Sequence, residues 1–399
     1  MTDKLRQIDS LALFRGLRDK EPLRSLCDFL RKMEAGYTID EMISAYGHFV
    51  SVLYELRSDA NLAAALWEAL VDSENPFLKC KIDSILDPEN SREISTLMRL
   101  TAERELDLLS EISDCTSYDF KEQMYYDGYL PDFNSSHIDF KERYMRLIEN
   151  IEREGYGIYS RFLMFRIEKG EIVPVEHPDP ICEEELFCYE RQRGLVLKNT
   201  ADFLKGKPAA DVLLYGDAGT GKSSTVKAVV RKFREAGLRL VELPKSELEN
   251  LSSVIVKLSK IPMKFVLFID DVSFESNDER IGSLKSVLEG AASGGRKNMV
   301  IYCTSNRRHL IKESFADRSD EIHTSDTIAE QMSLSERFGL RVLFDKPNKD
   351  TFLEIVRKLA ALKRISVDDE ELCAGAERFA LRGGGRSARL ARQYIDSLV

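Results

Sequence analysis

The chain has 399 residues, of which 43% are hydrophobic and 32% are charged. This length suits two or three domains, and the composition is that of a soluble globular protein, which excludes collagen-like, low-complexity and disordered classes. The net charge of −10 lies wholly in residues 1–170, which hold 22 Lys and Arg against 32 Asp and Glu, whereas residues 171–399 hold 36 of each. A generally basic nucleic-acid-binding protein is therefore disfavoured.

The apolar runs reach about half of the ~18 residues that a membrane span needs. The first ten residues carry acids and no apolar stretch ahead of a cleavage site, so they do not form a signal peptide. The seven cysteines and five histidines are scattered, with no CxxC spacing. We therefore expect a cytoplasmic protein without a membrane partner, with reduced thiols and without a zinc site.

Residues 1–170 have the pattern of an all-α N-terminal domain. Apolar residues recur at helical spacing in four segments, with Pro22, Pro76 and Pro88 between them: Ile8–Leu30, Ile43–Leu56, Ala63–Leu70 and Ile94–Ile112. An aromatic stretch follows, from Tyr118 to Phe133. It is either a partner-binding face or packing between helices, and we favour packing.

Residues 171–182 form the predicted linker, because Pro174, Pro178 and Pro180 follow Gly170 closely. Beyond it, helical segments alternate with short apolar strands at 211–215, 238–243, 264–270, 298–303 and 339–344. This alternation predicts an α/β domain over 183–345, a parallel five-stranded sheet with helices on both faces. Residues 346–399 are predicted to be a helical C-terminal subdomain.

A phosphate-binding motif follows the first of these strands. The strand runs directly into a GxxxxGK[ST] sequence, and a helix is predicted after it, which is the context that this motif needs. Its backbone N–H groups would surround the β-phosphate of ATP, while the lysine reaches the β and γ oxygens and the serine hydroxyl binds Mg²⁺. The predicted binding residues are Gly216, Asp217, Ala218, Gly219, Thr220, Gly221, Lys222, Ser223 and Ser224.

Polar residues also end the third and fourth strands of this series. The strand over 264–269 closes with Asp270, placed to hold Mg²⁺, and Asp271, placed to polarise the attacking water, with Glu275 as a second candidate base. The strand over 299–303 leads to Thr304 and Asn306, of which Asn306 is better placed to contact both the γ-phosphate and the water. A helix N-cap role for Asn306 is compatible with that contact.

Two arginine groups complete the candidate site. Arg337 precedes the fifth predicted strand, and Arg386 and Arg389 begin the last predicted helix. A guanidinium group is always charged and forks onto phosphate oxygens, which suits it to stabilising a transferring phosphoryl group.

In this order, the motifs resemble those of the AAA+ ATPases over about residues 182–399. Four stretches, Val212–Asp217, Phe268–Glu275, Thr304–Leu310 and Leu334–Gly339, resemble more closely a bacterial family of AAA+ proteins called domain of unknown function 815. The resemblance implies that Lys222 and Ser223 form Walker A, that Asp270 and Asp271 form Walker B, and that Asn306 is the first sensor.

The resemblance also implies the roles of the arginines. Arg337 would be the arginine finger that reaches a neighbouring subunit's ATP, and Arg389 the second sensor in a C-terminal helical lid, with Arg386 as the alternate. Leu186–Gln192 would border the adenine. Two positions depart from the common pattern: Asp271 stands where many AAA+ proteins have Glu, and Cys188 where many have Gly.

The leading interpretation is an ATP hydrolase, assembled into a ring or filament, that remodels or loads a protein client chosen by the acidic N-terminal domain. The alternative is a slowly hydrolysing, ATP-gated interaction switch, which the short Asp271 favours. A third interpretation is a DNA-associated loader, which rests on Arg307, Arg308, Lys312 and the C-terminal arginine series.

Overall fold

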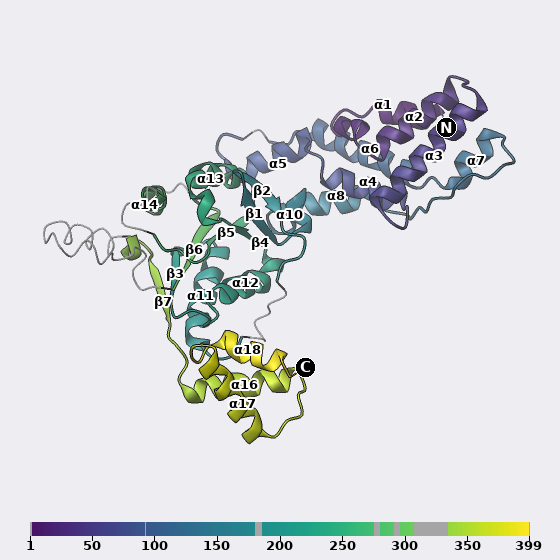
Figure 1. Cartoon of the computed structure of the whole chain (residues 1–399). Coiled ribbons are helices and arrows are strands. Elements are labelled where there is room, and N and C mark those ends of the chain that lie inside the picture. The colour runs from purple at the N-terminus through teal and green to yellow at the C-terminus, as the bar shows by residue number, and fades with distance from the viewer. Residues whose placement is uncertain are drawn as a thin grey trace. The chain divides into compact units, whose positions relative to one another are not determined.

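The computed structural model (Figure 1) describes residues 2–91, 93–179, 186–274, 280–290, 296–306 and 334–398. The chain divides into two compact units, Met1–Arg161 and Phe162–Val399, here called the N-terminal and C-terminal units. Among the helices in the described ranges, none combines the length and the apolar character that a membrane crossing requires.

The N-terminal unit is built from helices, with one isolated parallel bridge between Asn61 and Asn134. Several of the helices begin with a residue whose side chain caps a backbone N–H. At α3, for example, Thr38 and Glu41 form a reciprocal capping box. The elements are α1 (Thr2–Asp9), η1 (Arg15–Asp19), α2 (Leu23–Glu34), α3 (Ile39–Leu56), α4 (Leu62–Val71), α5 (Pro76–Leu86), α6 (Thr96–Ser113), α7 (Ser117–Met124), α8 (Phe140–Glu149), α9 (Ile151–Glu154) and α10 (Ile158–Arg161).

The aromatic stretch after α6 is divided between core and surface. Phe120 and Phe133 are 0% and 6% exposed and contact each other with ring centroids 5.8 Å apart. Tyr118, Tyr125 and Tyr129 are instead 66%, 95% and 87% exposed. The packing interpretation therefore holds for the phenylalanines and is wrong for these tyrosines.

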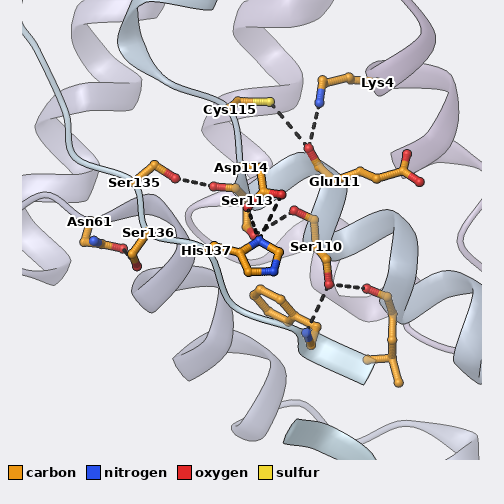
Figure 2. Close-up of polar contacts among 12 residues, drawn as sticks. Lys4, Asn61, Ser110, Glu111, Ser113, Asp114, Cys115, Ser135, Ser136 and His137 are labelled. Carbon is orange, nitrogen blue, oxygen red and sulfur yellow. Dashed lines mark hydrogen bonds and ion pairs between the residues drawn. The ribbon is translucent and has the colours of Figure 1, made fainter. Parts of the chain in front are cut away.

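The end of α6 fixes the segment that leads into α8 (Figure 2). The Ser110 hydroxyl accepts the backbone N–H of Phe140 at 3.0 Å, and His137 Nδ1 lies 3.0 Å from the Asp114 carboxylate. The Ser135 hydroxyl donates to the carbonyl of Ser113. These polar contacts attach residues 135–140 to the end of α6. The Ser135 hydroxyl donates to a backbone carbonyl and not to the imidazole of His137.

The C-terminal unit contains one seven-stranded sheet in the order β2-β1-β4-β5-β6-β3-β7. All neighbouring strands are parallel except the β1–β2 pair. The prediction of a parallel α/β sheet is thus confirmed, but the predicted count of five strands is wrong. The strands are β1 (Met164–Glu168), β2 (Glu171–Pro174), β3 (Val212–Gly216), β4 (Leu238–Glu242), β5 (Lys264–Ile269), β6 (Met299–Ser305) and β7 (Leu340–Phe344).

The two additional strands form an antiparallel hairpin where we predicted helix and linker. Lys169 and Gly170 connect them with φ of 52° and 76°, and a two-residue turn with both φ values positive matches the right-handed twist of the strands. The unit boundary at Arg161 therefore precedes the predicted boundary at 170, and the first four residues of the predicted linker belong to the sheet.

Helices cover both faces of the sheet (Figure 1). α11 (Glu190–Leu204) and α12 (Lys222–Lys232) pack on one face through apolar residues such as Val196 and Val229. α13 (Leu251–Ser259) and α14 (Arg280–Gly290) lie on the side away from them. The short elements η3 (Arg234–Ala236) and η4 (Lys245–Asn250) join strands to helices.

A separate helical group follows β7. Its helices enclose their own apolar core, which includes Phe352, Leu372 and Ile395 and also receives Cys188 from the segment before α11. The group comprises α16 (Lys349–Leu362), α17 (Asp369–Arg382) and α18 (Ala388–Asp396).

Candidate nucleotide-binding site

The phosphate-binding motif forms the loop between β3 and α12, at the carboxyl end of the central strands. Gly216 has φ of 129°, and a Cβ there would lie 2.2 Å from the carbonyl oxygen of Phe344 on β7. Gly219 has φ of 76° and faces Ser387 and Arg389 at the start of α18. Only glycine allows these backbone conformations at such close approach, so the loop is fixed between β7 and the C-terminal helices.

Lys222 begins α12 and is 6% exposed. Its ammonium donates to the carbonyls of Gly216 at 3.0 Å and Asp217 at 2.7 Å and to Asn306 Oδ1 at 3.0 Å. Burial lowers the pKa of Lys222, while the nearby carboxylates of Asp217, Asp271 and Asp270 oppose that shift. A buried cation at the mouth of a glycine-rich loop is suited to a phosphate, whose charge would compensate for the lost hydration.

Ser223 and Asp270 bring two oxygen ligands together. The Ser223 hydroxyl donates to Asp270 Oδ1 at 2.6 Å, and the Thr304 hydroxyl donates to the same oxygen. A hydroxyl and a carboxylate are the oxygen ligands that Mg²⁺ prefers, so this pair fits the predicted metal role. Bound there, the ion would neutralise charge on the β- and γ-phosphates.

Asp271 and Asn306 meet at the ends of neighbouring strands. Asn306 Nδ2 donates to Asp271 Oδ1 at 2.7 Å, so this amide bridges Asp271 and Lys222. Asp271 has φ of 50°, an αL conformation that costs a non-glycine residue roughly 1–2 kcal/mol. Its backbone N–H donates to the Thr304 hydroxyl at 2.8 Å, which helps to hold it in that conformation.

These residues line one hollow of about 520 Å³, within the range of small-molecule sites. Its far wall is apolar: Leu186, Phe187 and Tyr189 approach from the segment before α11, and Ile355 and Leu359 from α16. One end therefore offers N–H groups, a lysine and carboxylates, whereas the other offers apolar surface, as a nucleotide's phosphates and base would require.

Two residues in the segment before α11 are fixed in unusual conformations. Cys188 and Tyr189 have φ of 62° and 59°, and the Tyr189 hydroxyl donates to the carbonyl of Asp345 at 2.6 Å. Burial raises the pKa of Tyr189 to about 12 and that of Cys188 to about 11, so both remain neutral at physiological pH. At the position where many AAA+ proteins have Gly, this chain thus presents an uncharged thiol.

The arginines of the C-terminal helices have different positions. Arg389 lines the hollow, and its backbone N–H donates to the carbonyl of Gly219 at 3.1 Å. Arg386 is instead held by Glu377 in a two-pronged ion pair at 2.8 and 2.6 Å. This difference makes Arg389, rather than Arg386, the arginine that a molecule bound in the hollow would contact.

Arg337 does not line the hollow. It forms an ion pair with Glu289 of α14 in the same chain, and within the described residues its buried Nε has no hydrogen-bond partner. The structure therefore brings together the loop, Asp270, Asp271, Asn306 and Arg389, and leaves Arg337 outside this group.

Several residues that line the hollow were not predicted to do so, among them Phe344, Arg193 and Arg392. Asp217, a predicted loop residue, accepts the backbone N–H of Lys346 through Oδ2 at 3.1 Å. The spacing of three between Arg389 and Arg392 on one helix was a signal for the latter. The remaining predicted residues, Glu275, Arg307, Arg308 and Lys312, lie outside the described residues.

Comparison with known families identifies the chain. Residues 160–399 match the family described as "Protein of unknown function (DUF815)". The chain belongs to this family. The family recognised in the sequence, an AAA+ ATPase of DUF815 type, is confirmed, and the match covers the C-terminal unit of the DUF815 chain.

Individual relatives of the DUF815 chain are more distant. The proteasome-activating nucleotidase of Methanococcus vannielii is 28% identical over 227 residues, which are 51% of this chain and 52% of the relative. The chain thus spans about half the length of this curated relative.

Among solved structures, the RuvB Holliday junction branch migration motor of Thermotoga maritima is 19% identical with a TM-score of 0.38, covering 54% of this chain and 63% of that one. The ORC2 protein of Aeropyrum pernix is 12% identical with a TM-score of 0.37, covering 55% and 70%.

Proposed function

We propose that the chain binds ATP with Mg²⁺ in the hollow beside the β3–α12 loop and hydrolyses it to ADP and phosphate. One observation carries the proposal: Asn306 joins Lys222, which would bind phosphate, to Asp271, which would bind the attacking water. A single amide is thus within hydrogen-bond distance of the groups that act on the two reactants of hydrolysis.

The chemistry follows from these positions. Lys222 and the loop N–H groups would stabilise the charge that builds on the phosphate oxygens. Asp271 would accept a proton from the water as its oxygen attacks the γ-phosphorus, and the bond from that phosphorus to the β–γ bridging oxygen would break to release ADP. Asn306 would orient both the water and the carboxylate.

Oligomerisation is part of the proposal because Arg337 does not reach the hollow of its own chain. As the arginine finger, it would act on the ATP of a neighbouring subunit, where such arginines contribute roughly 10³–10⁵ in turnover. A head-to-tail contact of this kind gives a ring if it closes and a filament if it does not. The client would be a protein selected by the N-terminal unit.

The test is ATP turnover per subunit over a wide range of protein concentration, for wild type, Arg337→Ala and the exposed control Arg382→Ala. Turnover that rises with concentration and collapses only in Arg337→Ala is the expected result. Equal activity of all three proteins would refute the shared site. Lys222→Ala should abolish ATP binding, and normal affinity in that variant would overturn the site assignment itself.

A second candidate is an ATP-gated interaction switch. The constrained, short Asp271 favours it, because its carboxylate is already engaged by Asn306 and reaches less far than the glutamate common in AAA+ proteins. Bound ATP with negligible turnover at every concentration would support the switch over the hydrolase.

A further inference from the structure

A second hollow, of about 250 Å³, lies in the N-terminal unit among α4, α8 and the short helices α9 and α10. Its volume is well above the 10–15 Å³ that a single water needs, yet about half that of the nucleotide hollow. Trp67 forms one wall and is held edge-on by Phe140, with ring centroids 5.8 Å apart. The wall is therefore a fixed aromatic surface.

Two arginines also line this hollow, and both are exposed. The guanidinium of Arg143 lies 4.2 Å from the Trp67 ring centroid, and Arg146 follows it one turn along α8. In the described part of the chain, neither guanidinium has an ion-pair or hydrogen-bond partner. Burial lowers the pKa of Arg143, and the like charge of Arg146 lowers it further. Because stacking occupies the faces of a guanidinium, its N–H edge remains available for an oxyanion.

A carboxylate, that of Asp72, lines the same hollow. Asp72 Oδ2 pairs with Arg161 at 2.6 Å, whereas its Oδ1 is buried and has no hydrogen-bond partner among the described residues. Burial raises the pKa of Asp72, and the charge of Arg161 opposes that shift. A ligand in the hollow can reach only the exposed part of this carboxylate, whose side chain is 32% exposed, and there it would supply an N–H or O–H donor.

The charges of the lining residues indicate which charges a ligand of this hollow should carry. Three arginines and three carboxylates line the hollow: Arg143, Arg146, Arg161, Glu68, Asp72 and Glu154. Glu68 is already paired with Arg57 at 2.6 Å. A dianion such as phosphate would meet these carboxylates, whereas a molecule with one carboxylate and one ammonium group would match both signs.

We propose that this hollow binds a small zwitterion of amino-acid or dipeptide size. Its carboxylate is bound by Arg143 and Arg146, its nitrogen donates to Asp72, and its carbon chain lies against Trp67. The residues of this site all belong to the N-terminal unit and none of them lines the first hollow, so that unit would have a small-molecule ligand of its own.

Trp67 is the sole tryptophan of the chain, so its fluorescence reports on this hollow alone. The full-length protein is titrated with L-alanine and with glycylglycine, which separate an amino acid from a dipeptide. Succinate, which lacks nitrogen, and glycinamide, which lacks a carboxylate, are the matched probes. A saturable change in emission with at least one zwitterion, and a weaker one with both matched probes, is expected.

Arg146→Gln is the decisive variant, and Arg99→Gln, an exposed arginine paired with Glu103 on α6, is its control. Loss of one charge-assisted hydrogen bond weakens binding by about tenfold or more in Arg146→Gln and leaves Arg99→Gln unchanged. The proposal is overturned if neither zwitterion gives a saturable signal up to about 10 mM, if succinate or inorganic phosphate binds as tightly, or if Arg146→Gln binds normally. Isothermal calorimetry on the wild type checks the same ranking of probes without any variant.

Discussion

The ion pair between Arg337 and Glu289 opposes the proposed intersubunit role of Arg337. To reach a neighbouring subunit, the guanidinium must first leave Glu289, so Glu289→Gln should make it available at lower protein concentration. The two side chains are 28% and 48% exposed, which places the pair with surface ion pairs worth about 0.2–1 kcal/mol. The expected gain in apparent assembly affinity is therefore about 1.4- to 5-fold, because 1.4 kcal/mol corresponds to tenfold.

The assay is ATP turnover per subunit against protein concentration, read as the concentration of half-maximal turnover. Glu249→Gln is the control, since it removes an equal charge from an exposed residue of η4 for which no ion pair is found among the described residues. We expect Glu289→Gln to reach half-maximal turnover at a lower protein concentration than wild type, and Glu249→Gln to be unchanged. An unchanged curve, or one shifted to higher protein concentration, would refute the idea that the pair restrains Arg337, and it would leave the proposed ATP site untested by this experiment.

Three further predictions concern the site and the unit boundary. Asp271→Asn should preserve ATP binding and lower turnover by about 10²–10⁴, the usual contribution of a general base, as measured by nucleotide binding and phosphate release. Arg389→Ala should weaken ATP binding by about tenfold or more, whereas Arg386→Ala should first lower the stability of the α16–α18 group, and equal affinities in a binding titration would contradict this ranking. A fragment of residues 162–399 should fold and bind ATP, whereas 171–399 should fold poorly because it lacks β1, which pairs with both β2 and β4; circular dichroism and thermal unfolding compare the two.

The phosphate-binding end of the site was predictable because its signals are local. A glycine-rich loop between a strand and a helix, and polar residues directly after two parallel strands, determine where Lys222, Asp270 and Asn306 converge. Parallel strands present their carboxyl ends on one edge of the sheet, so the contacts among these residues follow once the strands are recognised. The structure additionally shows which atom donates and which accepts in each hydrogen bond among these residues.

The β1–β2 hairpin was missed although the sequence contains a signal for it. Met164–Glu168 alternates buried and exposed residues at its end, and Lys169-Gly170 is a turn that selects a two-residue hairpin. The nearby prolines suggested a linker instead. Pro174 is tolerated because it is the last residue of β2, at one end of the sheet order.

The position of the last helices could not be predicted from sequence. The choice between Arg386 and Arg389 depends on Glu377, which pairs with Arg386, and on the carbonyl of Gly219, which accepts the backbone N–H of Arg389. Both contacts depend on how α17 and α18 pack, which no local pattern encodes. For the same reason, the Arg337–Glu289 pair was not expected.

The five residues of β7 adjoin three parts of the chain to which the proposed function gives a role. Arg337 precedes it in the chain, Gly216 pairs with its last residue, Phe344, and α16 begins shortly after it. Gly216 and Phe344 are in close backbone contact, because even a methyl group at Gly216 would collide with the Phe344 carbonyl. If the chain assembles as proposed, a displacement of this strand by a neighbouring subunit would move the β3–α12 loop and the α16–α18 group together, so that one short strand would coordinate nucleotide entry, cleavage and release between subunits.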